Sequence, residues 1–384
     1  MGAASLASAV ALSVPGVAQA QQTVKVGLIA TLTGPQAASG RQKVAGARLY
    51  MAQHGDTVAG KKIELVVKDD TGVADITRRH ATELIVNEKA IAIAGFSLTP
   101  LALAVAPVIT QAKVPAVIMT AGTSVITERS PYFVRVSFTL PQQTVPIAEW
   151  VAKNGAKTAV SLVSDYGPGI DAQDAFKMRF EERGGKVLEQ LKAPLANPEF
   201  SAFLQRAKDL KPDALFLFVP APTAGALMKQ VIDRGLTEAN IKVVGTGDIT
   251  DDDQLNGIGD SVLGLTTSHF YSAAHDSPLN KKFVEEFKKA NNGMRPNFIG
   301  VGGYDGMHAI YEALKKTNGD TDGTKLVDAM KGATWESPRG MMTIDPATRD
   351  VVQDVYIRKV EKKDGELYNI EFDVVKQVKD PMHK

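Results

Sequence analysis

The chain has 384 residues, enough for two domains, and 44% of them are hydrophobic, so each domain has the apolar side chains for a sizeable core. Its 44 Lys and Arg residues nearly balance its 43 Asp and Glu residues, and this net charge of +1 argues against nucleic acid or an anionic membrane as a partner. The chain has no Cys, which excludes disulfide bonds, thiolate metal sites and attachment of a lipid through Cys.

The amino terminus predicts a signal peptide for export. Residues 1–20 are small and apolar and end in an A-x-A cleavage pattern, although they lack the usual basic start. The apolar run from Leu6 to Val17 is too short to span a bilayer, and a Pro-Gly pair interrupts it. We therefore expect an exported, soluble mature protein.

Strands and helices alternate through the first 120 residues of the mature chain. Short apolar runs that end in Gly or Asp indicate strands buried on both faces, and longer amphipathic runs indicate helices. This alternation predicts a doubly wound parallel sheet. The expected strands are 24–30, 63–68, 91–94 and 116–119, and the expected helices are about 40–53, 75–87 and 99–113.

A second alternating block follows a short strand at 134–136, so we predict an α/β fold built from two similar halves. Its expected helices are about 144–153, one ending near 183, 200–210, 223–234, 279–290, 304–315 and 324–331. Its expected strands are 158–163, 186–191, 214–218, 241–244, 262–267, 341–344, 351–359 and 368–374.

The stretch from Ile91 to Glu128 carries the strongest indication of a ligand site. Two neighbouring strands end there in turns rich in hydroxyls and backbone N–H groups, at the sheet edge where ligands bind in open α/β folds. The helix that begins at Thr99 points its N-terminus at this edge, which favours an anion. A carboxylate or phosphate site on Thr99, Ala121 and Thr123 is one interpretation. The other, which this stretch alone favours, is that these residues only cap a helix and shape a turn.

No pattern in the sequence indicates an enzyme. None of the six His residues has a metal-binding spacing, and neither a GxSxG nor a Walker A motif occurs. The glycine-rich run 300–306 does not follow a strand, and the acidic run 251–253 is better explained by helix capping than by calcium binding. We therefore expect no catalysis, no metal and no cofactor.

Several segments, taken in order, resemble the type I periplasmic solute-binding proteins of ABC importers. Within that group they are similar to the leucine/isoleucine/valine-binding branch, an extracellular ligand-binding receptor family. Each motif alone is weak evidence, but their order and spacing together are specific. The resemblance covers nearly all of the mature chain. The segments are VKVGLIATLTGPQAASG, VVKDDTG, IAIAGFSLTPLALAVAPV, VPAVIMTAGTS, SDYGPGIDAQDAFKMRFEERGGKV and LKPDALFLFVPAPTAGALMKQ.

The resemblance implies two Rossmann-like lobes joined by a three-segment hinge, with the ligand held between them. The crossovers are expected near 139–142, 269–274 and 344–349. The division that we expect is a signal peptide at 1–20, lobe 1 at 23–140 plus 274–346, and lobe 2 at 141–273 plus 347–384.

The resemblance also implies site residues. In the family, a hydroxyl residue four positions after the Gly that ends the third strand holds the ligand carboxylate, and here that residue is Thr99. The next turn contributes positions that match Ala121 and Thr123, and the Tyr of the second-lobe YG turn matches Tyr166. These matches favour a ligand site over simple capping.

Three family positions differ in this chain. The Tyr of the first loop is replaced by Ser39, and an aromatic residue of the second lobe by Pro220 or Ala221. The acidic residue that pairs with a ligand ammonium falls on Gly247, with Asp248 next to it. Carboxylate binding is therefore expected to be kept, whereas ammonium binding depends on whether Asp248 reaches the site.

Loss of two cleft aromatics leaves room for a bulkier ligand, which Phe96, His269, Phe270 and Tyr271 could line, although each could equally be a core or surface residue. We expect a monomeric periplasmic protein that binds a small carboxylate, with an aromatic or 2-oxo acid favoured, and delivers it to an inner-membrane ABC permease. A branched-chain or other aliphatic amino acid is the alternative ligand, and an extracytoplasmic sensor is the alternative role.

Overall fold

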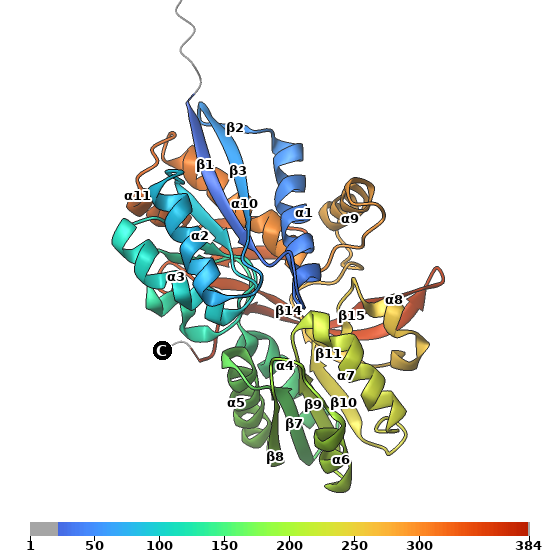
Figure 1. Cartoon of the computed structure of the whole chain (residues 1–384). Helices are drawn as coiled ribbons and strands as arrows, with labels where there is room; N and C mark the ends of the chain where they lie inside the picture. Colours follow the sequence, from blue (N-terminus) through green and yellow to red (C-terminus); the bar gives the residue numbers. More distant parts are fainter. Residues whose placement is uncertain (1–21, 383–384) are drawn as a thin grey trace, which may run out of the picture.

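The computed structural model describes residues 22–382 and shows two β-sheets, each covered by helices on both faces (Figure 1). The predicted signal peptide, residues 1–20, lies outside the described residues. The mixed α/β architecture with two mainly parallel sheets confirms the predicted fold class.

The first sheet has six strands, and all except the edge strand β2 run parallel to their neighbours. In spatial order they are β2 (Thr57–Val58), β3 (Lys61–Asp69), β1 (Thr23–Ala30), β4 (Ala92–Gly95), β5 (Ala116–Ile118) and β6 (Phe133–Arg135). The accompanying helices are α1 (Ala37–His54), α2 (Ala74–Val86), α3 (Thr99–Ala112), α9 (Pro278–Ala290), α10 (Phe298–Lys316) and α11 (Gly323–Met330).

Alternation along the central strand β1 explains why this sheet needs helices on both faces. Leu28 belongs to the core cluster that includes residues of α1 and α10, whereas its neighbour Ile29 belongs to the cluster that includes residues of α2 and α3. Successive strand residues point to opposite faces, so an unbroken apolar run buries both. The continuous run in the sequence was therefore a correct indication of a doubly covered strand.

The second sheet has nine strands, and its parallel part, from β8 to β11, repeats the plan of the first sheet. In spatial order they are β12 (Thr334–Ser337), β13 (Gly340–Ile344), β14 (Val351–Lys363), β11 (Thr266–His269), β10 (Lys242–Thr246), β9 (Ala214–Phe218), β7 (Thr158–Ser164) and β8 (Lys186–Ala193), with β15 (Glu366–Val378) also paired to β14. The helical segments are α4 (Leu140–Lys153), α5 (Gly167–Glu182), α6 (Ser201–Asp209), α7 (Ala221–Asp233) and α8 (Leu255–Ile258), with short 3₁₀ turns η2 (Gly247–Thr250) and η3 (Asp260–Val262). A further 3₁₀ turn, η1 (Ser124–Arg129), packs against α3 and β6 of the first half.

Strand β14 runs through the junction between the two halves, as Figure 1 shows. Its first residues, 351–353, pair with β13, and residues 356–359 pair with β11. The segment 344–349, where we expected the third crossover, forms the turn between the antiparallel partners β13 and β14. The strands β12 and β13 thus join the second sheet by hydrogen bonding, and the lobe boundaries given above stay a prediction.

The glycine-rich run 300–306 lies inside α10, so this helix begins six residues earlier than we predicted. Its glycines allow close packing against α1, because a Cβ on Gly303 would collide with the backbone carbonyl of Lys43, and a Cβ on Gly46 of α1 with that of Gly300. Glycine lowers helix propensity by about 1 kcal/mol per residue. Tight packing of the two helices overrides that local preference here.

Candidate ligand-binding cleft

A narrow, partly open cavity lies at the facing carboxyl ends of the parallel strands of the two sheets, with about 380 Å³ of space that no atom fills, including space open to solvent. This is the edge at which open α/β sheets bind ligands. Its lining residues come from the loops after β1, β4, β5, β7, β9 and β10, from the segment before α4 and from the start of α10. They are Gln36, Ser39, Ser97, Leu98, Thr99, Thr120, Ala121, Gly122, Phe138, Leu140, Tyr166, Pro168, Phe218, Pro220, Ala221, Pro222, Asp248, Phe298 and Ile299.

Most of the residues selected from the sequence meet at this cavity. Five of them line it directly: Ser39, Thr99, Ala121, Tyr166 and Asp248. Thr123 lies beside them, because its Oγ1 is 2.8 Å from Oγ1 of Thr99. The two hydroxyls are nearly buried, and each can also donate or accept a further hydrogen bond.

Phe96 does not reach the cavity. Its side chain is fully buried in the core between the sheet and helices α2 and α3, and its backbone has a φ of +66°. Its carbonyl accepts a hydrogen bond of 3.2 Å from the N–H of Ala121. The Ala121 amide therefore has a backbone partner already, and Phe96 shapes the site only by fixing this turn.

Phe270 is also displaced from the lining and stands behind it. Its ring centroid is 5.3 Å from that of Phe138 and 6.0 Å from that of Phe298, and both of these rings line the cavity. His269 stacks on the same ring at 4.6 Å, and the guanidinium of Arg339 lies 4.7 Å above it. Phe270 thus supports the aromatic wall from the core.

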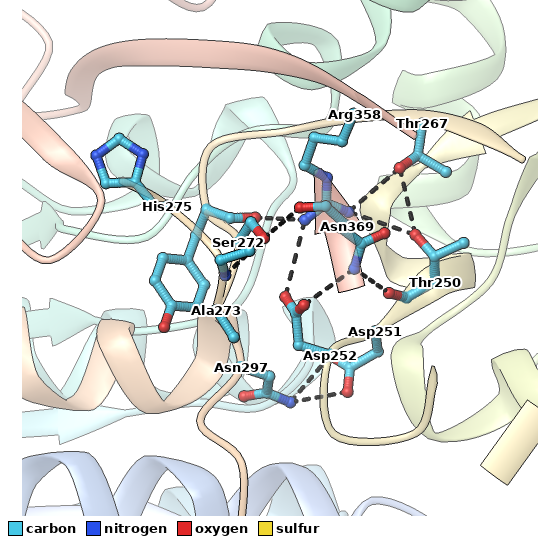
Figure 2. Close-up of polar contacts among 12 residues, drawn as sticks. Thr250, Asp251, Asp252, Thr267, Ser272, Ala273, His275, Asn297, Arg358 and Asn369 are labelled. Atoms are coloured by element: carbon cyan, nitrogen blue, oxygen red, sulfur yellow. Dashed lines mark hydrogen bonds and ion pairs between the residues drawn. The ribbon is translucent and has the colours of Figure 1, made fainter. Parts of the chain in front are cut away.

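Gly247 faces away from the cavity, toward the buried side chain of Arg358. A Cβ at this position would overlap the Arg358 guanidinium and the ring of His269. The guanidinium contacts hydroxyls of Thr250 and Thr267 at 3.4 and 3.2 Å, in a network that Figure 2 shows. A carboxylate-bearing residue at 247 therefore has no room in this chain.

The Arg358 network also joins segments that are far apart in the sequence (Figure 2). Arg358 of β14 pairs with Asp252 at 3.9 Å and donates to the carbonyl of Tyr271. Asn369 of β15 donates to the carboxylate of Asp252 at 3.0 Å, and Asn297 at the start of α10 donates to that of Asp251 at 2.9 Å. The junction beneath the cleft is therefore held by buried polar groups that bond to one another, although Arg358 Nε and Asn369 Oδ1 find no partner among the described residues.

Sequence reasoning missed several lining residues, among them Ser97, Thr120, Phe138, Phe218 and Phe298. Phe218 ends β9, and its ring stacks nearly parallel to that of Tyr166 at 6.2 Å. The hydroxyl of Thr120 is buried without a partner among the described residues, so it is available to a ligand. The place of Phe218 at a strand end could have indicated its role, because the carboxyl ends of parallel strands meet at the edge where ligands bind.

Asp248 brings a carboxylate into this largely apolar cavity. The side chain is only 3% exposed, and its Oδ2 accepts a hydrogen bond of 2.8 Å from the hydroxyl of Thr246. Burial raises the pKa of the carboxyl to about 6, against the opposing effects of the Thr246 hydrogen bond and the Arg358 charge. Burial also raises the pKa of the Tyr166 hydroxyl, and the charge of Asp248 adds to that effect. The second half therefore offers a hydrogen-bond acceptor that is poorly compensated when the cavity is empty.

The two halves touch each other beside the cavity. Asp171 of α5 accepts a hydrogen bond of 2.9 Å from the backbone N–H of Ser124 across the cleft. Burial raises the pKa of Asp171 to about 6. Gly167 packs against Thr123, and a Cβ there would lie 2.7 Å from the Thr123 hydroxyl oxygen.

Within residues 22–382, no cluster of His, Asp and Glu side chains could hold a metal ion. Among the helices that the structure describes, none is long and apolar enough to cross a membrane.

Two parallel sheets with a cavity at their facing carboxyl edges, built on hydroxyl-rich turns, define a periplasmic solute-binding protein of type I. The chain matches the periplasmic binding protein family over residues 23–366, and it belongs to that family. It is 44% identical to Leu/Ile/Val-binding protein homolog 6 of Brucella abortus (strain 2308), over 93% of each chain.

Solved structures give the same assignment. A solute-binding protein of an ABC transporter from Rhodopseudomonas palustris BisB5, in complex with 3,4-dihydroxybenzoic acid, is 59% identical, with a TM-score of 0.92 over 94% of this chain and 99% of the other. A second R. palustris solute-binding protein, in complex with 4-hydroxybenzoate, is 43% identical, with a TM-score of 0.90 over the same shares. The present chain is thus a solute-binding protein of an ABC transporter, as the sequence predicted.

Proposed function

We propose that this protein binds a hydroxylated aromatic carboxylate in the cleft and delivers it to an ABC permease in the inner membrane. The observation that carries the proposal is the buried carboxylate of Asp248 in the wall of a cavity whose other side presents hydroxyl groups. One end of such a ligand is an anion that needs donors, and the other end is a phenol that needs an acceptor. The wall with the hydroxyl groups supplies the donors, and the wall with Asp248 supplies the acceptor.

The hydroxyls of the first half form the anion end. Thr99, Thr120 and Ser97 all line the cavity, and a hydrogen bond to a charged group is worth about 1.5–3 kcal/mol. The Thr99 hydroxyl is held in place by Thr123, which reduces the entropy lost on binding. Because Ala121 donates its N–H to Phe96, the hydroxyls are assigned the larger share of this work.

Aromatic side chains form the walls of the slot between these ends. Phe138, Phe218, Phe298 and Tyr166 line the cavity together with three prolines. Aromatic pairs contribute about 0.5–1.5 kcal/mol beyond the burial of their area. A bulky family aromatic is replaced by Pro220 or Ala221, and these two lining residues leave a flat apolar surface suited to a ring.

Asp248 is assigned to a ring hydroxyl, which donates a hydrogen bond to the carboxylate. The ligands seen in the two R. palustris relatives, 3,4-dihydroxybenzoic acid and 4-hydroxybenzoate, carry such a group and support this assignment. An amino acid is the second candidate, since Asp248 could equally accept from an ammonium group and the curated relatives carry the name Leu/Ile/Val-binding.

Calorimetry with a ligand series separates these candidates. The series is 3,4-dihydroxybenzoate, 4-hydroxybenzoate, benzoate, phenylpyruvate, phenylalanine and leucine. We expect 4-hydroxybenzoate to bind at least about tenfold more tightly than benzoate, and Asp248→Asn to reduce that difference, because the hydrogen bond to a charged acceptor is lost. If phenylalanine or leucine binds tenfold more tightly than any benzoate, the ligand is an amino acid and the proposal fails.

The compartment and assembly follow from the family and are part of the proposal: a periplasmic, monomeric protein that closes on its ligand and then docks on the permease. Permease and ATPase genes beside this gene would support transport, whereas a neighbouring receptor gene would favour the sensor. Size-exclusion chromatography with light scattering tests the monomer.

A further inference from the structure

We propose that Lys43 is the buried counter-charge for the ligand carboxylate and acts on it through the hydroxyl of Ser97. The inference rests on the proposed function in one respect, that the ligand is a carboxylate bound at the first half. Lys43 lies in α1, and neither the sequence patterns nor the family resemblance indicated a role for it.

Lys43 occupies an unusual position for a lysine. Its side chain is fully buried, and its Nζ donates a hydrogen bond of 3.1 Å to Oγ of Ser97. Ser97 in turn lines the cavity, between Phe96 and the start of α3. Lys43 therefore lies one side chain away from the space that the ligand fills.

The protein groups around Lys43 balance its ammonium charge poorly. In the described part of the chain, no ion pair within 4.0 Å joins Lys43 to a carboxylate, and the hydrogen bond to Ser97 uses one of its three donors. Buried charges normally occur paired, because an unpaired one is costly. An anion in the cavity would supply the missing partner.

One charged group does act on Lys43 from a distance. The carboxylate of Asp70, on the turn after β3, favours the charged form of the lysine, but it is already bonded to the hydroxyls of Thr31 and Thr77 at 2.6 and 3.2 Å. From the other packed elements, α10 presents the backbone at Gly303 and the β4 turn presents Ser97. Burial outweighs Asp70 and lowers the pKa of Lys43 to about 7.

The arrangement predicts a relay in which no covalent bond changes. The Lys43 ammonium donates to Ser97 Oγ, which leaves the Ser97 O–H free to donate to the carboxylate, and each bond strengthens the other. Binding of the anion raises the pKa of Lys43, so the protein takes up a proton when it binds ligand above neutral pH. With a pKa of about 7 in the free protein, the uptake approaches about 0.8 proton per ligand near pH 7.5.

The test is calorimetry of the full mature protein in buffers of different ionisation enthalpy, with the carboxylate series above and with 4-hydroxybenzamide as a neutral analogue. We expect Lys43→Met to lower the affinity for 4-hydroxybenzoate by about tenfold or more, to shrink its advantage over the amide, and to abolish proton uptake near pH 7.5. Asp248→Asn shows how much of the proton uptake occurs at the Asp248 carboxyl rather than at Lys43. Arg48→Met is the matched control, because Arg48 is an exposed cation on the same helix as Lys43.

The results distinguish this inference from the proposed function. If no carboxylate of the series binds to the wild-type protein, both are overturned. If carboxylates bind but Lys43→Met keeps the wild-type affinity ratio and proton uptake, the proposed function stands and the role of Lys43 is overturned. Should Lys43→Met fail to fold, Ser97→Ala decides, because it breaks the relay at its second member and is expected to reduce proton uptake in the same way.

Discussion

Replacing Asp248 by Asn should make the ligand-free protein more stable, although it weakens the proposed site. The carboxyl is almost completely buried, and its main side-chain partner is the Thr246 hydroxyl. An Asn side-chain oxygen accepts the hydrogen bond from that hydroxyl equally well. The substitution keeps the shape of the residue and removes the charge. Binding sites often trade stability for function in this way.

The size of the effect follows from the pKa. Burial raises the pKa of Asp248 from 3.8 to about 6. At about 1.4 kcal/mol per pH unit, this difference corresponds to about 3 kcal/mol of destabilisation once the group is ionised in both states. Because the folded-state pKa of this acid is raised, the cost is absent below pH 3.8, grows between 3.8 and about 6, and is complete above 6.

Urea unfolding of wild type and Asp248→Asn at pH 4, 5 and 7.5 measures this profile. We expect the variant to be more stable by up to about 3 kcal/mol at pH 7.5 and nearly equal to wild type at pH 4. Asp233→Asn, at an exposed position of α7, is the matched control and should show no such gain. A variant that is less stable than wild type at pH 7.5, or a gain that does not shrink in acid, would refute the reasoning.

Three further predictions concern binding and closure. Thr99→Ala and Thr123→Ala should each lower ligand affinity by about ten- to hundredfold with the fold intact, because each removes a hydrogen bond to a charged group. Calorimetry that shows unchanged affinity in both variants would count against the anion site. Saturating ligand should reduce the radius of gyration in small-angle scattering, since the cleft contacts across Asp171 and Ser124 form only on closure, and an unchanged profile would argue against a hinge. Asp171→Asn should tighten binding several-fold near pH 7.5 but not below pH 4. Closure of the cleft buries the Asp171 carboxyl and raises its pKa to about 6, so the charged acid opposes closure at neutral pH and the protonated acid does not. Equal affinities of variant and wild type at both pH values would disprove this.

The fold and one wall of the site could be predicted because both follow from local patterns. Unbroken apolar runs such as 24–30 are buried on both faces, and the turns that follow such strands must meet at one sheet edge. Thr99 was selected by that rule, with which the family pattern agrees, and Tyr166 by the family pattern alone. The short strands β2 and β12 were missed, since two to four residues carry too little pattern to be distinguished from a loop.

Side-chain direction and long-range packing could not be predicted in the same way. Phe96 and Phe270 adjoin the site in sequence, but the backbone turns their rings into the core. Nothing in the sequence distinguishes Lys43 from an ordinary exposed lysine, and only the close approach of α10 and the β4 turn buries it.

The buried charges also explain how ligand chemistry could control closure. Closing the cleft takes Asp248 and Asp171 out of water, and each then has its pKa raised to about 6, so the empty closed form is disfavoured at neutral pH. A phenolic hydroxyl that donates to Asp248 offsets part of this cost, and a carboxylate beside Ser97 offsets the unbalanced charge of Lys43. A ligand that lacks either end leaves one buried charge uncompensated. Under the proposed ligand assignment, the closed shape that a permease would recognise is therefore most stable with a ligand that carries both groups.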